Sequence, residues 1–165
     1  MNHITIRRPS PPDFAAIAEI YADEAVVAQT AQLPFGDAAF WGAFYKARDP
    51  HAIEFVAEID GKIVGHLGIW TNAHPRRKHV ASFGIGVHSA FQRRGVGNAL
   101  MAAMIAMTDN WLNITRLELG VFADNENAIR LYEKFGFERE GLARAACFRA
   151  GRYVDTLSMA RLRLE

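Results

Sequence analysis

The chain has a single cysteine, no internal repeat and no low-complexity run. Cys147 is the only thiol among 165 residues, so no disulfide can form within the chain, and this fits a reducing compartment. The segment from Met1 to Arg8 mixes polar, basic and apolar side chains and has no apolar stretch of signal-peptide length. No window approaches the roughly 20 apolar residues that a membrane-spanning helix needs. These absences predict a soluble, cytoplasmic protein without a membrane partner.

The chain also lacks a strong net charge. Its formal charge is +1, from 19 Lys and Arg against 18 Asp and Glu. The bulk basic field that nucleic-acid-binding proteins often carry is therefore missing, and we predict no nucleic-acid partner. Hydrophobic residues make up 50% of the sequence. A chain of this size suits one domain and buries roughly 70% of the surface that its unfolded form exposes.

The spacing of apolar residues predicts about seven strands and about four helices. Strands are expected over residues 3–8, 52–59, 62–71, 79–88, 116–122, 137–148 and 153–164. Helices are expected from residue 10 onward and over residues 37–48, 97–111 and 127–135. Since strands and helices alternate only in part, this order predicts an α/β fold with a mixed sheet. The unit from His79 to Phe122 predicts a parallel crossover.

Two glycines stand where the third expected helix begins, in Gln92-Arg93-Arg94-Gly95-Val96-Gly97. A helix start offers free N–H groups and the positive end of the helix dipole, and glycines let backbone amides close on a phosphate. The segment lacks the Lys-Ser/Thr pair of a magnesium-dependent phosphate loop, and it lacks the Gly-x-Gly-x-x-Gly pattern of dinucleotide binding. Taken alone, the spacing fits a phosphate-binding loop and an ordinary glycine turn equally well.

The expected strand before this loop has small residues on one face. Ser82, Gly84 and Gly86 alternate with Phe83, Ile85 and Val87. A face without side chains predicts that something bulky lies against it. The alternative is a bulge or a closely packed helix.

In three blocks the sequence resembles the GNAT superfamily of N-acetyltransferases. One block is the strand and loop just described. A second, Asn125 to Phe137, resembles the family's Asn-x-x-Ala-x-x-Leu-Tyr-x-Lys-x-Gly-Phe pattern. A weaker third is Asp60 to Gly65, and the order of elements matches from Ile6 to Leu162. Local strings such as Val64-Gly65-His66-Leu67 are most similar to bacterial L-amino-acid N-acetyltransferases of the YhhY type.

The resemblance implies one N-acetyltransferase domain over residues 1–165, with a mostly antiparallel sheet splayed at the acyl-CoA site. It implies transfer of acetyl from acetyl-CoA to the primary amine of a small substrate, an amino acid or related metabolite, by direct attack. No covalent enzyme intermediate and no metal are then needed, and Cys147 need not be a nucleophile. Family members often dimerise, so a homodimer is expected. Two alternatives stay open: an acyl-CoA-binding module without turnover, and an enzyme that acetylates peptides or proteins.

The resemblance also implies which residues contact the cofactor. They are Ile85, Val87, Gln92, Arg93, Arg94, Gly95, Val96, Gly97, Asn125 and Tyr132. Ile85 and Val87 would pair through their backbone with pantetheine, much as an added strand does, and one strand amide would polarise the thioester carbonyl. The alternative for Asn125 is a helix N-cap, and for Tyr132 a core position.

For catalysis, the family pattern assigns Tyr132 as the general acid that protonates the leaving thiolate. Many family members carry a carboxylate base on the strand before the loop, but this chain has Ala81 and Ser82 there. His79 is the predicted base, with His66, Glu118 or a water as alternatives, and structural roles remain open for each. The predicted acceptor-binding residues are Thr30, Gln32, Phe35 and Tyr153.

Overall fold

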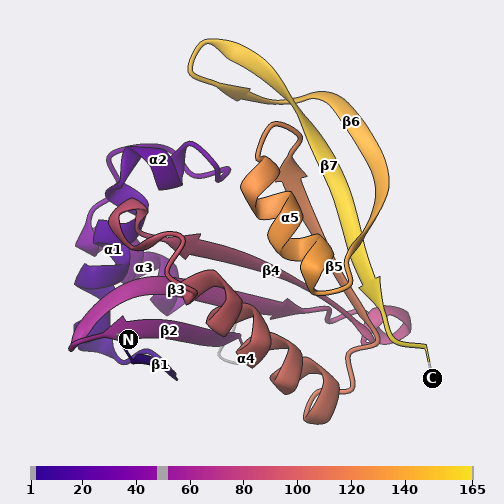
Figure 1. Cartoon of the computed structure of the whole chain (residues 1–165), viewed down its shortest axis with the longest axis horizontal. Coiled ribbons are helices and arrows are strands. Elements are labelled where there is room, and N and C mark those ends of the chain that lie inside the picture. Colours follow the sequence, from indigo (N-terminus) through magenta and orange to yellow (C-terminus); the bar gives the residue numbers. More distant parts are fainter. Residues whose placement is uncertain (1–2, 48–51, 165) are drawn as a thin grey trace. The chain divides into compact units, whose positions relative to one another are not determined.

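The computed structural model describes residues 3–47 and 52–164, and in this range it has seven strands and five α-helices (Figure 1). The strands are β1 (Ile4–Arg7), β2 (Ile53–Ile59), β3 (Lys62–Thr71), β4 (Val80–Val87), β5 (Arg116–Phe122), β6 (Glu138–Arg149) and β7 (Arg152–Leu162). The α-helices are α1 (Phe14–Ala22), α2 (Glu24–Val27), α3 (Ala38–Ala47), α4 (Val96–Asn110) and α5 (Glu126–Lys134). Three short 3-10 helices are η1 (Pro11–Asp13), η2 (Pro75–Arg77) and η3 (Ser89–Phe91).

The strands form one sheet in the order β1-β2-β3-β4-β5-β7-β6. The pairs β1–β2, β2–β3, β5–β7 and β6–β7 are antiparallel. Strands β4 and β5 are parallel, with Val80 opposite Arg116 and Ser82 opposite Glu118, and α4 lies between them in the sequence. The α/β fold with a mixed, mostly antiparallel sheet is therefore confirmed, while the splay at the acyl-CoA site stays a prediction.

The chain divides into two compact units. The first contains residues 1–70 and 84–106, and the second contains residues 71–83 and 107–165. Strand β4 passes from the second unit into the first between Phe83 and Gly84.

The first expected helix is broken into α1 and α2, which accounts for the fifth helix. Asp23 is extended, with φ −63° and ψ 118°, and its side chain accepts a hydrogen bond from the Ala25 amide at 3.0 Å. A short acidic side chain that bonds the backbone in this way favours a new helix start over continuation of the old one. The expected end of the second helix, at about Arg48, lies outside the described residues.

In the first unit, helices cover both faces of β3. A Cβ built on Gly65 would lie 2.8 Å from Val96 Cγ1 and 3.0 Å from Leu100 Cδ1, both on α4. The next residue, His66, meets Tyr21 of α1 instead. Because neighbouring residues of a strand point to opposite faces, α4 and α1 lie on opposite sides of β3 (Figure 1).

The core on the α1 side is aromatic and aliphatic. Its buried members come from α1, α2, α3, β2 and β3: Ile17, Ala18, Ile20, Tyr21, Val26, Trp41, Val56 and Ile63. Burying a side chain of this size contributes about 1.5–3 kcal/mol, so this cluster holds α1 against the strands.

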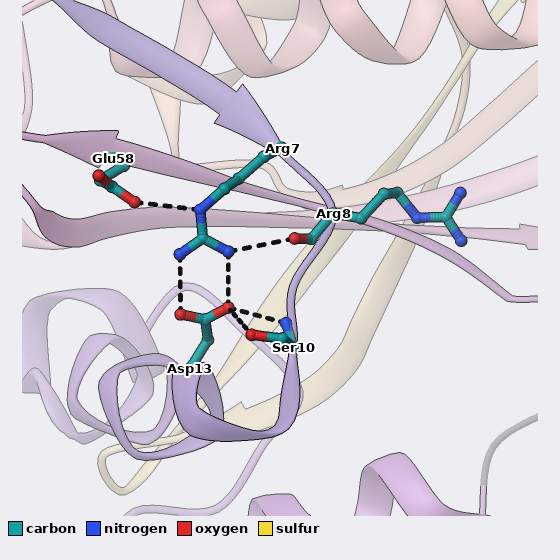
Figure 2. Close-up of polar contacts among 5 residues, drawn as sticks. All are labelled: Arg7, Arg8, Ser10, Asp13 and Glu58. Carbon is teal, nitrogen blue, oxygen red and sulfur yellow. Dashed lines mark hydrogen bonds and ion pairs between the residues drawn. The ribbon is translucent and has the colours of Figure 1, made fainter.

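An ion-pair cluster joins β1 to the start of the first helix (Figure 2). The Arg7 guanidinium donates to both carboxylate oxygens of Asp13, at 2.7 and 2.9 Å, and to Glu58 of β2 at 3.0 Å. Asp13 also accepts from the amide of Ser10 at 2.8 Å, as the Ser-x-x-Asp start of this helix suggests. The hydrogen bonds from Arg7 lower the pKa of Asp13 from 3.8 to about 2.

We expect Asp13→Asn to lower the free energy of unfolding by about 1 kcal/mol at neutral pH, because the amide loses a charge-assisted pair with a partly exposed arginine. The folded pKa of Asp13 lies below its unfolded value, so this stabilisation is present above about pH 4 and is lost as the pH falls toward about 2. Urea unfolding of wild type and variant should therefore differ at neutral pH and converge in acid.

Asp60→Asn is the matched control, since Asp60 lies in the β2–β3 turn with φ 49°, a conformation that asparagine tolerates. Its stability should stay within about 0.5 kcal/mol of wild type. Equal urea midpoints for wild type and Asp13→Asn at neutral pH would show that the Arg7–Asp13 pair contributes nothing.

Candidate active site

The glycine loop connects η3 to α4 within the first unit. Arg93 and Gly95 both have left-handed backbones, with φ of 61° and 86°. Gln92 is exposed, and its side-chain amide donates to the carbonyl of Val87 at 3.1 Å. This bond ties the loop to the end of β4, and the helix follows at once, with the amide of Ala99 bonded to the carbonyl of Gly95 at 3.0 Å.

The loop has the features of an anion site. Within residues 3–47 and 52–164, the amides of residues 93–95 donate to no backbone carbonyl. The first-turn amides of a helix have no intrahelical acceptor either, and the dipole of α4, 15 residues long, places its positive end here. The Arg94 guanidinium and the Lys62 ammonium lie 5.2 and 5.4 Å from the ring centroid of Phe91. Lys62 is a cation at this loop that no sequence pattern indicated.

The glycines of β4 face aromatic side chains. A Cβ built on Gly84 would lie 3.0 Å from Cη2 of Trp70, and one on Gly86 would lie 3.0 Å from Cε1 of Tyr21. The bulky groups expected against this face are thus side chains of the protein itself. At Gly86 the structure has the close helix packing that was the alternative interpretation of the sequence, because Tyr21 belongs to α1. Ile85 and Val87 alternate with these glycines along β4.

A buried chain of hydrogen-bonded side chains lies on the face of β3 that Tyr21 of α1 covers. The Tyr21 hydroxyl is 2.7 Å from Nδ1 of His66, and Nε2 of His66 is 3.3 Å from Oε2 of Glu54. The Tyr21 ring stacks on Trp41 with 4.6 Å between centroids. His66 was one of the alternative bases expected from the sequence, whereas its partners Tyr21 and Glu54 were not predicted. Tyr21 belongs to an apolar helical stripe and reads as core, whereas a carboxylate between Ile53 and Phe55 was a usable signal for Glu54.

The residues expected to bind the acceptor in the first unit lie in the segment between α2 and α3. The Thr30 hydroxyl donates to the Val27 carbonyl at 2.9 Å and accepts from the Gln32 amide at 3.1 Å, which makes a local turn. Phe35 is exposed and has φ 69°, a conformation that is rare for a bulky residue. Thr30 and Gln32 are therefore adjacent, and Phe35 presents its ring to solvent.

In the second unit, Tyr132 lies on α5 between two phenylalanine rings. Its centroid is 5.7 Å from that of Phe83 and 5.9 Å from that of Phe137. Its burial raises the pKa of the phenol to about 12. Within the described part of the chain, no hydrogen bond involves its hydroxyl. The phenol thus keeps its proton at neutral pH and has it available for donation.

Asn125 is the N-cap of α5. Its side-chain oxygen accepts from the amide of Ala128 at 3.2 Å. The capping role left open from the sequence is present, and it uses only the oxygen of the side-chain amide, so the NH2 group is not part of this bond.

The remaining base candidates differ in their surroundings. His79 is exposed in the turn before β4, and its carbonyl accepts from the amides of Thr115 and Arg116 at 3.0 and 3.1 Å. Glu118 on β5 accepts from Arg77 and Arg116, at 2.8 Å each. The Glu118 carboxylate is therefore occupied by two guanidinium groups.

Tyr153 lies on the exposed β6–β7 hairpin. Its ring centroid is 5.2 Å from that of Phe148. Nearby, the Asp155 carboxylate accepts from the amide of Ala145 at 2.8 Å, where β6 bulges with φ 52°. Asp155 thus shapes the hairpin that carries Tyr153.

Over residues 3–47 and 52–164, no group of three or more His, Cys, Asp and Glu side chains is placed to hold a metal ion. None of the helices described here is long and apolar enough to cross a membrane.

Comparison with known proteins identifies the family. Residues 11–137 match the model of the Acetyltransferase (GNAT) family. The L-amino acid N-acetyltransferase AaaT of Escherichia coli (strain K12) is 45% identical over 163 residues, which cover 99% of this chain and 100% of the relative. Phosphinothricin N-acetyltransferase of Alcaligenes faecalis is 27% identical, covering 95% of this chain and 81% of that protein.

Solved structures share the fold. The structure of yncA of Salmonella typhimurium with its cofactor acetyl-CoA has a TM-score of 0.84 and 25% identity, covering 98% of this chain and 94% of that one. A phosphinothricin acetyltransferase from Sinorhizobium meliloti, in complex with the same cofactor, has a TM-score of 0.86 at 22% identity and covers 96% of this chain and 88% of its own, which supports the fold. The resemblance drawn from the sequence is confirmed, and the chain belongs to the acetyltransferase (GNAT) family of acetyl-CoA-dependent N-acetyltransferases.

Proposed function

We propose that this N-acetyltransferase moves acetyl from acetyl-CoA to the primary amine of an L-amino acid or a related metabolite. The observation that carries the proposal is the 45% identity with an L-amino acid N-acetyltransferase, which extends over 99% of the chain. We treat residues 1–165 as one N-acetyltransferase domain, since the family match from 11 to 137 runs through both compact units.

In this proposal the cofactor's pyrophosphate binds the amides of Arg93 to Gly97, with Gln92 at the loop entrance. Two observations support this: among the described residues the amides of residues 93–95 donate to no backbone carbonyl, and the dipole of α4 places its positive end at the loop. Pantetheine then pairs with the backbone of Ile85 and Val87. Asn125 contacts the cofactor through the part of its side chain that does not cap α5.

We expect Gly95→Ala to raise the dissociation constant of acetyl-CoA roughly tenfold, because a residue with a Cβ strains this backbone by about 1–2 kcal/mol and shifts the loop amides. Gly95 has φ 86°, and an added Cβ would meet only Ile4 Cδ1, at an ordinary 3.7 Å. The strain is therefore confined to the backbone. Isothermal titration calorimetry with acetyl-CoA measures the change.

Gly136→Ala is the matched control. Gly136 follows α5 with φ 87°, and an added Cβ meets nothing within 4 Å, so the same backbone strain arises away from the loop. Both variants should lose similar stability in urea, but only Gly95→Ala should weaken acetyl-CoA binding. Unchanged binding in both variants would remove the loop from the cofactor site.

The reaction forms a bond between the amine nitrogen and the acetyl carbon and breaks the bond between that carbon and sulfur. The thiolate needs a proton, and we assign its donation to Tyr132, whose pKa of about 12 keeps the phenol protonated. The substrate ammonium must first lose a proton. His79 is one proposed base, since a histidine side chain suits proton transfer at neutral pH.

We expect Tyr132→Phe to lower kcat roughly 100-fold while the dissociation constant of acetyl-CoA stays near wild type, because only the proton donor is lost. Phe137→Leu is the control for packing around this ring, since it leaves the hydroxyl in place. Steady-state kinetics at several pH values checks both variants. If kcat of Tyr132→Phe equals wild type at every pH, Tyr132 is not the acid.

An acceptor screen tests the proposed function itself. Release of CoA thiol is followed with acetyl-CoA and a panel of free L-amino acids, other small amines, and peptides with free N-termini or lysines. We expect turnover with free L-amino acids and little with peptides. Turnover confined to peptides would mean a peptide or protein acetyltransferase, and tight CoA binding without thiol release would mean a binding module.

In the same proposal, the amine acceptor is bound by four residues: Thr30, Gln32, Phe35 and Tyr153. We infer a cytoplasmic homodimer, and the exposed Leu142, Phe148 and Tyr153 on the β6–β7 hairpin support a contact between copies.

A further inference from the structure

The chain from Tyr21 through His66 to Glu54 has no role in the function proposed so far. Its members come from α1, β3 and β2, and the side chains of His66 and Glu54 are only 6% and 7% exposed. Burying an imidazole and a carboxylate costs free energy that apolar side chains of the same volume would avoid. Packing alone therefore does not explain these two groups.

The order of the groups sets the direction in which a proton can move. A carboxylate only accepts hydrogen bonds, so a neutral His66 places its proton on Nε2, facing Glu54. Nδ1 is then the acceptor for the Tyr21 hydroxyl at 2.7 Å. A hydroxyl, an imidazole and a carboxylate in this order allow the imidazole to take the hydroxyl proton while the carboxylate stabilises the imidazolium.

The Tyr21 hydroxyl lies against β4. A Cβ built on Gly86 would be 3.2 Å from the Tyr21 oxygen, so the hydroxyl meets this strand between Ile85 and Val87. The proposed pyrophosphate loop follows the C-terminal end of β4, so pantetheine leads back along the strand and brings the thioester toward Gly86. The step from geometry to reaction thus rests on the proposed function.

We propose that Tyr21 is a catalytic residue that accepts the proton of the substrate amine, with His66 and Glu54 as its positioning residues. The ammonium nitrogen releases one proton to the Tyr21 oxygen as the Tyr21 hydroxyl proton passes to Nδ1 of His66. Tyrosine stays neutral, and an imidazolium forms beside the Glu54 carboxylate. The free amine attacks the thioester, and its C–N bond forms as the C–S bond breaks. The nitrogen then loses a second proton, which balances the one that the departing thiolate takes up, and His66 returns its proton through Tyr21 to solvent after the products leave.

This relay supplies what β4 lacks. Strand β4 has no carboxylate and no histidine between Val80 and Val87, and its glycines leave room for a tyrosine from α1. The proposed base, Tyr21, then approaches β4 from the side on which α1 lies. The alternative base, His79, lies on a different segment, so the two assignments can be separated by mutation.

The test uses the full chain with acetyl-CoA and a mixture of the common L-amino acids as the acceptor probe. Tyr21→Phe and Glu54→Gln keep the side-chain shapes, and His79→Gln removes the competing base. Val56→Ala is the packing control, because Val56 belongs to the same buried cluster and its side chain has no hydrogen-bonding group. Apparent kcat and KM, acetyl-CoA affinity and the urea midpoint are measured for each variant.

We expect Tyr21→Phe to lower apparent kcat roughly 100-fold with KM and acetyl-CoA affinity within about twofold of wild type, and Glu54→Gln to lower it roughly tenfold. Val56→Ala should keep wild-type kcat. In wild type, ¹⁵N NMR of labelled histidines should show His66 neutral with its proton on Nε2, a result that a packing role does not require.

Two results would overturn the relay alone: a Tyr21→Phe enzyme as fast as an active wild type, or a His66 that carries a proton on Nδ1. Loss of kcat in His79→Gln with none in Tyr21→Phe would assign the base to His79 instead. A wild type that releases no thiol with any amine overturns the proposed function first, and the relay with it, so the two failures are distinguishable.

Discussion

The close approach of α4 to β3 at Gly65 is the contact on which the position of the glycine loop depends. Val96 and Leu100 fill the space that a side chain at Gly65 would occupy, and both are almost fully buried. Protein interiors are packed tightly enough that a single methyl group here would displace the helix. Because the loop ends where α4 begins, the position of its amides follows from this contact.

A second tie fixes the other end of the loop. The amide of His88 donates to the carbonyl of Val64, the residue before Gly65, at 2.9 Å, and Gln92 bonds back to Val87. The loop is therefore held at both ends. At one end α4 packs on Gly65, at the other His88 bonds to Val64, and both contacts lie in the middle of β3. The same stretch of β3 carries His66 on its other face, so the glycine loop and the buried hydrogen-bonded chain are both held by this stretch.

Periodicity and turn chemistry predicted most of the elements, because α4, the β2–β3 hairpin and the β6–β7 pair each follow from local patterns. The break at Asp23 was missed, since a side-chain cap competes there with an otherwise continuous apolar stripe. The glycine loop was found because its signal is contiguous.

The hydrogen-bonded chain of Tyr21, His66 and Glu54 could not be predicted as a unit, because its members lie far apart in the sequence. Tyr21 and His66 are separated by 45 positions, and His66 and Glu54 by 12. Only the pairing of β2 with β3 and the packing of α1 bring them together. The aromatic rings that fill the glycine face of β4 were hidden for the same reason.

The left-handed backbone of Arg93 has a consequence for recognition. A residue with a side chain takes up φ 61° only where the surrounding fold imposes it, so folding and not ligand capture supplies the free energy of that conformation. An anion that meets amides already turned toward it loses little affinity to ordering of the loop. Preorganisation of this kind favours fast capture, and it leaves selectivity among acyl-CoA thioesters to groups that contact the acyl chain.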